Sequence, residues 1–209
     1  GQAARDLATA VGLLKAAGAQ YVVVQNLPDI GKTPLAASQG PQGQALFNGL
    51  STLYNSTLNA AIGAANLNVI QFNAFALATE TAANPALFGF VNATTPACTT
   101  PSSLACTPST LVAPNANTNY VFADGVHPTT GAAIVLSQAI ESMITGPQQM
   151  AALGQAPLDV ERANWRTLDG RMMSAINAPG SAGKLQAWAA YDYADADIFG
   201  ASLSGNGDI

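Results

Sequence analysis

Helical and strand-like patterns alternate along residues 4–145, and this alternation limits the folds that the chain can adopt. Apolar residues recur at helical spacing over residues 4–17, 44–65, 74–83 and 131–145. Two short apolar runs, at 21–26 and 68–72, have the composition of buried strands. Because alternating strands and helices favour a parallel sheet with helices on its faces, the sequence predicts an α/β fold. Active sites of such folds lie beyond the carboxyl ends of the strands.

The two long helices are each expected to turn one apolar face to the core. For the helix at 44–65 this face consists of Leu46, Leu50, Leu53, Tyr54, Leu58, Ala61, Ile62 and Ala65. For the helix at 131–145 it consists of Ile134, Ser137, Ile140 and Ile144. Thr129 or Thr130 can cap the second helix, and Gly146-Pro147 is expected to end it. We therefore expect one domain over 1–147, followed by a linker helix and a strand-like tail over 148–209.

Composition and charge exclude several classes of partner. The net charge is -5, and the seven Lys and Arg residues form no basic run, so nucleic acid is not an expected partner. Hydrophobic residues make up 49% of the chain and charged residues only 9%, which indicates a globular body with a neutral surface typical of secreted or cell-surface proteins. No run of about 18 apolar residues that could cross a membrane as a helix is present.

Two cysteines, Cys98 and Cys106, lie in a long segment, 84–119, that is rich in Pro, Thr and Ser. We expect a local disulfide formed in an oxidising compartment, and two reduced, inert thiols are the alternative. A zinc site is not expected, because His127 is the only histidine and four ligands cannot be assembled from the obvious candidates. The sequence implies no metal and no organic cofactor.

Asp124 and His127 are the residues best suited to chemistry. They are three positions apart in a loop that also contains Gly125 and Pro128. A hydrolytic base needs an imidazole whose Nδ1–H is held by a carboxylate, so that Nε2 can accept a proton from a serine hydroxyl. A solvated polar pair is the alternative for an isolated Asp-x-x-His. Asp29, between Pro28 and Gly31, is expected to be a turn residue rather than a catalytic acid.

Several segments, in the same order, resemble the GDSL (SGNH) ester hydrolases. Residues 122–129, FADGVHPT, resemble the last signature block of that family, 18–34 are similar to its strand followed by a Pro-x-x-Gly loop, and 84–98 resemble its Asn-Pro, Gly-Phe and Cys-bearing loop. The resemblance spans about residues 3–145. It implies the three-layer, flavodoxin-like SGNH fold and an esterase or lipase acting on ester substrates. In its Ser-His-Asp triad His127 would be the general base and then the general acid, and Asp124 would orient the imidazole and stabilise the imidazolium.

The chain departs from the family in lacking three blocks. The family's Gly-Asp-Ser, Gly and Gly-x-Asn-Asp blocks precede the matching segments, and none is found here. Residues 204–208, SGNGD, only loosely resemble the Asn block and are expected to form a turn. The resemblance therefore implies that this chain is the C-terminal half of the domain. The serine and the oxyanion donors would come from a missing N-terminal segment, without which the chain is inactive.

The tail suggests a subtype of the family. A GDSL hydrolase followed by a linker helix and alternating aromatic-bearing segments resembles the autotransporter esterases. Trp188, Tyr191 and Tyr193 would then belong to the start of a region whose outer-membrane β-barrel continues C-terminal to this chain, and a soluble extension is the alternative. Asp192, Asp195 and Asp197 are expected to form a solvated acidic turn rather than a calcium loop. A non-catalytic surface-displayed α/β binding module and a carbohydrate esterase are the rival functions.

Overall fold

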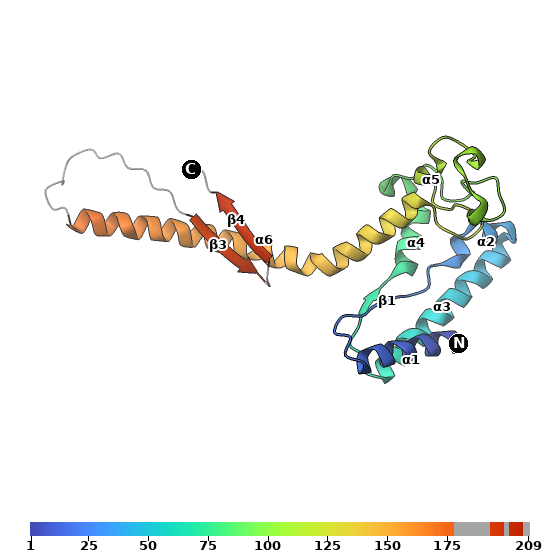
Figure 1. The fold of residues 1–209 in the computed structure, drawn as a ribbon, viewed down its shortest axis with the longest axis horizontal. Coiled ribbons are helices and arrows are strands. Elements are labelled where there is room, and N and C mark those ends of the chain that lie inside the picture. The colour runs from blue at the N-terminus through green and yellow to red at the C-terminus, as the bar shows by residue number, and fades with distance from the viewer. Residues whose placement is uncertain (178–192, 199–200, 207–209) are drawn as a thin grey trace. The chain divides into compact units, whose positions relative to one another are not determined.

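The computed structural model describes residues 1–177, 193–198 and 201–206 and divides into two units, Gly1–Ile140 and Glu141–Ile209. The first unit contains α1 (Gln2–Ala16), β1 (Val23–Gln25), α2 (Pro34–Ser38), α3 (Gly40–Ala64), β2 (Ile70–Phe72), α4 (Ala74–Ala83), α5 (Ala116–Asn119) and the start of α6 (Thr130–Asn177) (Figure 1). Short 3₁₀ helices lie at Ile30–Lys32, Pro85–Phe88, Ser103–Ala105 and Pro108–Thr110. The expected helices at 4–17, 44–65 and 74–83 are present, and so are both expected strands, although these are shorter than predicted.

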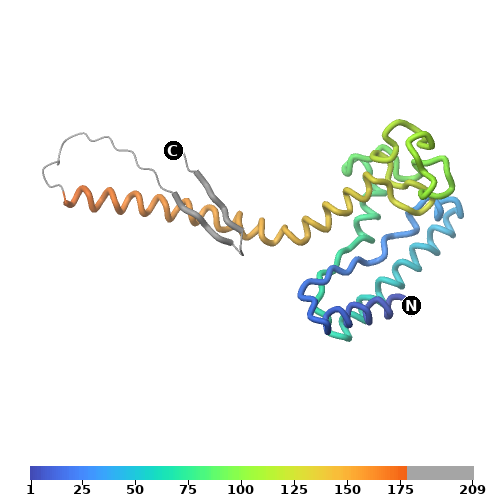
Figure 2. The backbone as a smooth tube through the Cα atoms, in the orientation of Figure 1, coloured from blue at the N-terminus to red at the C-terminus, as the bar shows by residue number. Residues whose placement is uncertain are grey.

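The first unit is mostly helical and contains a small parallel sheet of two strands. β1 pairs with β2 in the register Val23 to Ile70, Val24 to Gln71 and Gln25 to Phe72. The main core joins α1, α3 and β1 through Ala4, Ala8, Val11, Val24, Leu58 and Ile62. The backbone after β1 leads away from α1 to α2, next to the loops that follow α4 (Figure 2). The carboxyl end of β1 therefore faces the part of the chain that carries Asp124 and His127.

The expected apolar face of α3 is wrong for the N-terminal half of the helix. Leu46, Leu50 and Leu53 are 61%, 50% and 56% exposed, whereas Ser51 and Asn55 are buried. Leu58 and Ile62, nearer the C-terminus, do belong to the core against α1. The helix therefore buries an apolar surface at one end and a polar surface at the other.

The polar half of α3 is explained by the segment that follows β1. This segment has backbone groups that need partners, and side chains of α3 provide them. Asn55 Oδ1 accepts a hydrogen bond from Leu27 N at 2.8 Å, and Asn55 Nδ2 donates to Leu27 O at 2.8 Å. Ser51 Oγ accepts from Ile30 N at 3.2 Å. Leucines at these positions would leave the backbone groups of Leu27 and Ile30 without partners.

α6 continues well beyond its expected end at Gly146-Pro147 and contains both Pro147 and Pro157. A proline inside a helix costs about 3 kcal/mol, but helix-favouring residues continue on both sides, as in the sequence QQMAAL at 148–153. The expected apolar face is also wrong, because Ile134 and Ile144 are about half exposed and the buried residue near the start of the helix is Gly131. The domain boundary at residue 147 stays a prediction, since α6 crosses it without a break.

The second unit contains a pair of antiparallel strands, β3 (Tyr193–Ile198) and β4 (Ala201–Asn206), in a register that pairs Tyr193 with Asn206. The turns expected at 204–208 and around Asp195 and Asp197 are wrong, because 204–206 belong to β4 and both aspartates to β3. Trp188, Tyr191, Asp192, Gly207 and Asp208 lie outside the described residues. Within the described part of the chain, no helix is long and apolar enough to cross a membrane.

We expect Asn55→Ala to lower the free energy of unfolding by about 2 kcal/mol, because it removes the partners of both backbone groups of Leu27. Asn59→Ala is the matched control: Asn59 is one turn further along α3 and is exposed, so a change within about 0.5 kcal/mol is expected. Urea unfolding of the two variants measures the difference. Equal effects at the two positions would show that the contact with Leu27 does not hold the segment.

Candidate active site

The loop that carries Asp124 and His127 is closed by backbone hydrogen bonds. Ala123 N donates to His127 O at 2.8 Å, and Thr129 N donates to Val121 O at 2.9 Å. Thr129 Oγ1 donates to Tyr120 O at 2.6 Å and accepts from Ala132 N at 3.2 Å, so that Thr129 is the N-cap of α6. The loop is therefore fixed at both of its ends.

Asp124 is a buried carboxylate, 4% exposed, and three backbone N–H groups donate to it. Oδ1 accepts from Val126 N at 2.9 Å and from His127 N at 2.8 Å. Oδ2 accepts from Ser103 N at 2.7 Å. Because two of the donors come from the 122–129 loop and the third from a distant one, the carboxylate links the two segments.

The imidazole of His127 contacts the same carboxylate. His127 Nδ1 lies 3.0 Å from Asp124 Oδ1 and 2.9 Å from Oδ2. An ionised carboxylate only accepts hydrogen bonds, so Nδ1 carries the proton and Nε2 has a free electron pair. The histidine side chain is 68% exposed, and among the described residues none hydrogen-bonds to Nε2. The pair therefore presents an oriented base to solvent.

Burial and hydrogen bonding act in opposite directions on the Asp124 carboxyl. Burial raises its pKa, but the backbone N–H groups of His127, Val126 and Ser103, together with the His127 side chain, lower it by more. The net result is a pKa well below the ordinary range of an aspartate. Asp124 is therefore ionised at any pH at which an imidazole acts as a base.

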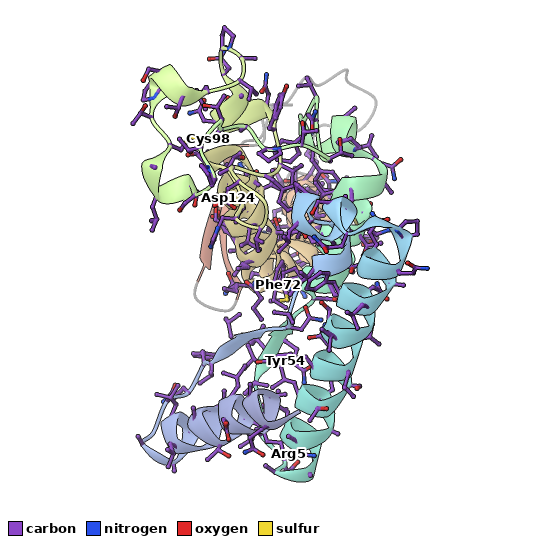
Figure 3. All side chains as sticks on the ribbon, turned by 90° about the vertical axis from the view of Figure 1, so that its right-hand side faces the viewer. Arg5, Tyr54, Phe72, Cys98 and Asp124 are labelled. Atoms are coloured by element: carbon purple, nitrogen blue, oxygen red, sulfur yellow. A yellow bond between two sulfur atoms is a disulfide. The ribbon has the colours of Figure 1, made fainter. Side chains whose placement is uncertain are left out.

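The expected disulfide between Cys98 and Cys106 is present, and it lies next to the site. Cys98 N donates to Ala123 O at 3.0 Å, directly before Asp124, and Cys106 N donates to Ser103 O at 3.1 Å. Figure 3 shows Cys98 and Asp124 close together at the end of the unit that lies away from Arg5 of α1. Sequence reasoning missed Ser103 because it acts through its backbone, and the cysteine pair around it is the only signal that could have indicated it.

Asp29 has the structural role that was expected of it. It is buried, and its Oδ1 accepts from Gly31 N at 2.9 Å, which forms a turn before the 3₁₀ helix. Its Oδ2 accepts from Asn48 Nδ2 at 2.9 Å. The next helix, α2, then reaches the site, because Leu35 N donates to Gly125 O at 2.9 Å. Asp29 therefore caps the 3₁₀ helix that precedes α2 and takes no part in the pair.

Metal-binding side chains do not cluster in the described part of the chain: no three or more His, Cys, Asp or Glu come together there. What the site offers chemically is a proton acceptor held by a buried anion. Such a base can activate a hydroxyl group that is brought to Nε2.

The family model and the similar proteins agree on one family. A family model described as GDSL-like Lipase/Acylhydrolase matches residues 1–140. Esterase EstA of Pseudomonas aeruginosa is 35% identical over 139 residues, which cover 65% of this chain and 21% of that protein. GDSL esterase/lipase APG of Arabidopsis thaliana is 29% identical over 148 residues, which cover 65% of this chain and 42% of that protein.

One similarity extends into the second unit. A Pseudomonas putida protein described as an uncharacterized protein in the trpE-trpG intergenic region is 27% identical over 205 residues, covering 96% of this chain and 34% of that protein. The chain thus spans less than half the length of each of these relatives. The family match ends at residue 140, which is also where the first unit ends.

The Asp124 carboxylate is expected to make stability depend on pH. The pKa of Asp124 is lower in the folded than in the unfolded state, so the ionised carboxylate stabilises the fold at pH values above its unfolded-state pKa of about 4. This stabilisation is lost as the pH falls from about 4 toward the folded-state pKa. Asp124→Asn should lower the free energy of unfolding by about 2 kcal/mol near pH 7. An amide has only one accepting oxygen, so it cannot accept hydrogen bonds both from His127 N, at the position of Oδ1, and from Ser103 N, at the position of Oδ2. Urea midpoints measured from about pH 7 to about pH 3 should show the gap between wild type and variant narrowing below about pH 4. A gap that stays constant over this range would contradict the assignment.

Proposed function

The chain belongs to the GDSL-like lipase/acylhydrolase family, and we propose that it is part of a serine ester hydrolase in which His127 is the general base and Asp124 is the carboxylate that orients it. The relatives named esterase or lipase support ester hydrolysis as the reaction. One observation within the chain carries the proposal: a buried carboxylate holds Nδ1 of an imidazole whose other nitrogen faces solvent.

The proposed reaction follows from the orientation of the imidazole. His127 Nε2 takes the proton from a serine hydroxyl while the serine oxygen attacks the ester carbonyl carbon. The resulting imidazolium is stabilised by the Asp124 carboxylate and then gives its proton to the leaving alkoxide. Water hydrolyses the acyl-serine by the same steps, again with His127 as base. Asp124 stays ionised throughout, as its low pKa requires.

We place the serine and the oxyanion donors in another segment of the same protein, upstream of these residues. The sequence has no Gly-Asp-Ser block, which supports this placement. So does the two-stranded sheet, because parallel sheets are normally larger and covered on both faces. Leu46, Leu50 and Leu53 leave an apolar stripe on α3 that further structure can cover, as in the three-layer fold. On this view residues 1–209 alone are inactive, because a triad acts as a unit.

The disulfide and the esterase relatives indicate a secreted or extracellular protein, since disulfides persist in oxidising compartments. We further propose the autotransporter type, anchored at the outer membrane. The order of elements supports it: a helix, α6, leads from the hydrolase unit to the paired strands β3 and β4. Detection of the complete protein at the surface of intact cells, against release into the medium, separates anchoring from secretion.

Activity should depend on both members of the pair in the complete protein. Asp124→Asn is expected to lower kcat about 10³–10⁴-fold, because an amide at this position favours the wrong imidazole tautomer, and His127→Ala should be at least as severe. The control is Asp29→Asn, a second buried aspartate whose turn an asparagine can keep, and we expect it to retain activity within a few-fold. Hydrolysis of short-chain and long-chain acyl esters and of acetylated sugars is the measurement.

The three substrate types distinguish the alternatives. Turnover of simple acyl esters identifies an esterase or lipase, whereas turnover confined to acetylated sugars identifies a carbohydrate esterase. No turnover of any ester by the complete wild-type protein would point to a non-catalytic binding module. Near-wild-type rates for both Asp124→Asn and His127→Ala would contradict the proposed roles.

A further inference from the structure

Ser103 occupies an unusual position next to the proposed base. Its backbone N–H donates to Asp124 Oδ2 at 2.7 Å, the shortest of the hydrogen bonds to that carboxylate, and Oδ2 is also the oxygen nearest to His127 Nδ1, at 2.9 Å. The N–H therefore shares one oxygen with the imidazole. Ser103 is 21 residues from Asp124 in sequence, so something must hold the two segments together.

Packing alone holds the Ser103 loop only weakly. Residues 99–105 are mostly exposed, and Leu104 is 97% exposed. The buried residues beneath the loop are small: Ala97, Cys98 and Ala116. A hollow of about 320 Å³, lined among others by Cys98, Ser103 and Cys106, lies beside it. A loop with so little apolar contact and open space next to it needs another restraint to keep one position.

The Cys98–Cys106 disulfide supplies that restraint. At one end, Cys98 is buried, and its N–H is bound to Ala123 O, next to Asp124. At the other end, Cys106 N donates to Ser103 O, which closes the 3₁₀ turn Ser103–Ala105. The covalent bond thus connects the backbone beside Asp124 to the turn that carries the Ser103 N–H.

We infer that the disulfide-closed loop is a positioning device for the proposed base, in which the Cys98–Cys106 bond holds the Ser103 N–H on Asp124 Oδ2 and thereby sets the orientation and basicity of the carboxylate that holds His127. This inference rests on the proposed function. Ser103 is a positioning residue, since it acts on the imidazole only through Asp124.

The direction of the effect follows from competition at Oδ2. A backbone donor withdraws charge from the oxygen, so losing it makes the carboxylate a stronger base. A more basic carboxylate binds the imidazolium more tightly and makes His127 easier to protonate. The acid limb of the pH profile of kcat/KM, which reports protonation of the free enzyme's base, should then move to higher pH. At the same time, a carboxylate free to rotate holds the imidazole less well, and kcat should fall.

Ser103→Pro removes this single N–H and leaves the disulfide in place. Ser103 is the first residue of its 3₁₀ helix, a position that favours proline, and Ser102 before it has φ −125° and ψ 135°, the extended conformation that a residue preceding proline prefers. In the complete enzyme we expect kcat to fall about tenfold, with KM within about twofold and the acid limb at higher pH. Leu104→Ala, in the same turn with an exposed side chain, is the control and should behave as wild type.

The disulfide is tested by combination. Cys98→Ala/Cys106→Ala should reproduce the changes in kcat and in the acid limb. Combining these substitutions with Ser103→Pro should change kcat and the acid limb little further, because the disulfide and Ser103 act through the same hydrogen bond. A folded Ser103→Pro enzyme with wild-type kcat and acid limb would overturn the inference. So would a loss of kcat with an unmoved acid limb, or fully additive effects of the two changes. The proposed function is judged separately, since it requires only that wild type hydrolyses esters and His127→Ala does not.

Discussion

The buried Asp124 carboxylate is the group on which the geometry of the site depends. An isolated charge in such a position would cost several kcal/mol, and it is tolerated because backbone N–H groups and an imidazole surround it. These donors come from two loops, so the carboxylate stays satisfied only while both loops keep their places. The stability of the two loops and the orientation of the base therefore depend on the same hydrogen bonds to Asp124. The arrangement that stabilises the anion also fixes the tautomer and direction of His127.

Support for the site extends from the sheet through polar contacts rather than through a large core. Asn55 and Ser51 of α3 hold the segment that follows β1, Asp29 turns this segment into α2, and Leu35 N of α2 binds Gly125 O beside Asp124. This explains why α3 buries polar side chains and leaves three leucines exposed. A two-stranded parallel sheet and an uncovered apolar stripe are consistent with part of a larger α/β domain.

The sequence allowed α1, α3, α4, both strands of the first unit, the disulfide and the Asp124–His127 contact to be predicted, because each leaves a mark in side-chain type or spacing, whereas the short helices α2 and α5 were not predicted. It did not allow the buried face of α3 to be predicted, since periodicity cannot reveal that a backbone segment needs polar partners there. The continuation of α6 through Pro147 was also missed, because a proline alone does not decide where a long helix ends. Ser103 could not be identified by type at all, because any residue except proline supplies the N–H that it contributes.

Labelling of the complete protein with a fluorophosphonate, which modifies activated serines, shows directly whether Asp124 and His127 serve a nucleophile. We expect one labelled serine, located by mass spectrometry in a segment outside these 209 residues, and loss of labelling in the His127→Ala protein. Labelling of a serine within the chain, or labelling that persists without His127, would contradict the claim that Asp124 and His127 activate a nucleophile supplied by another part of the protein.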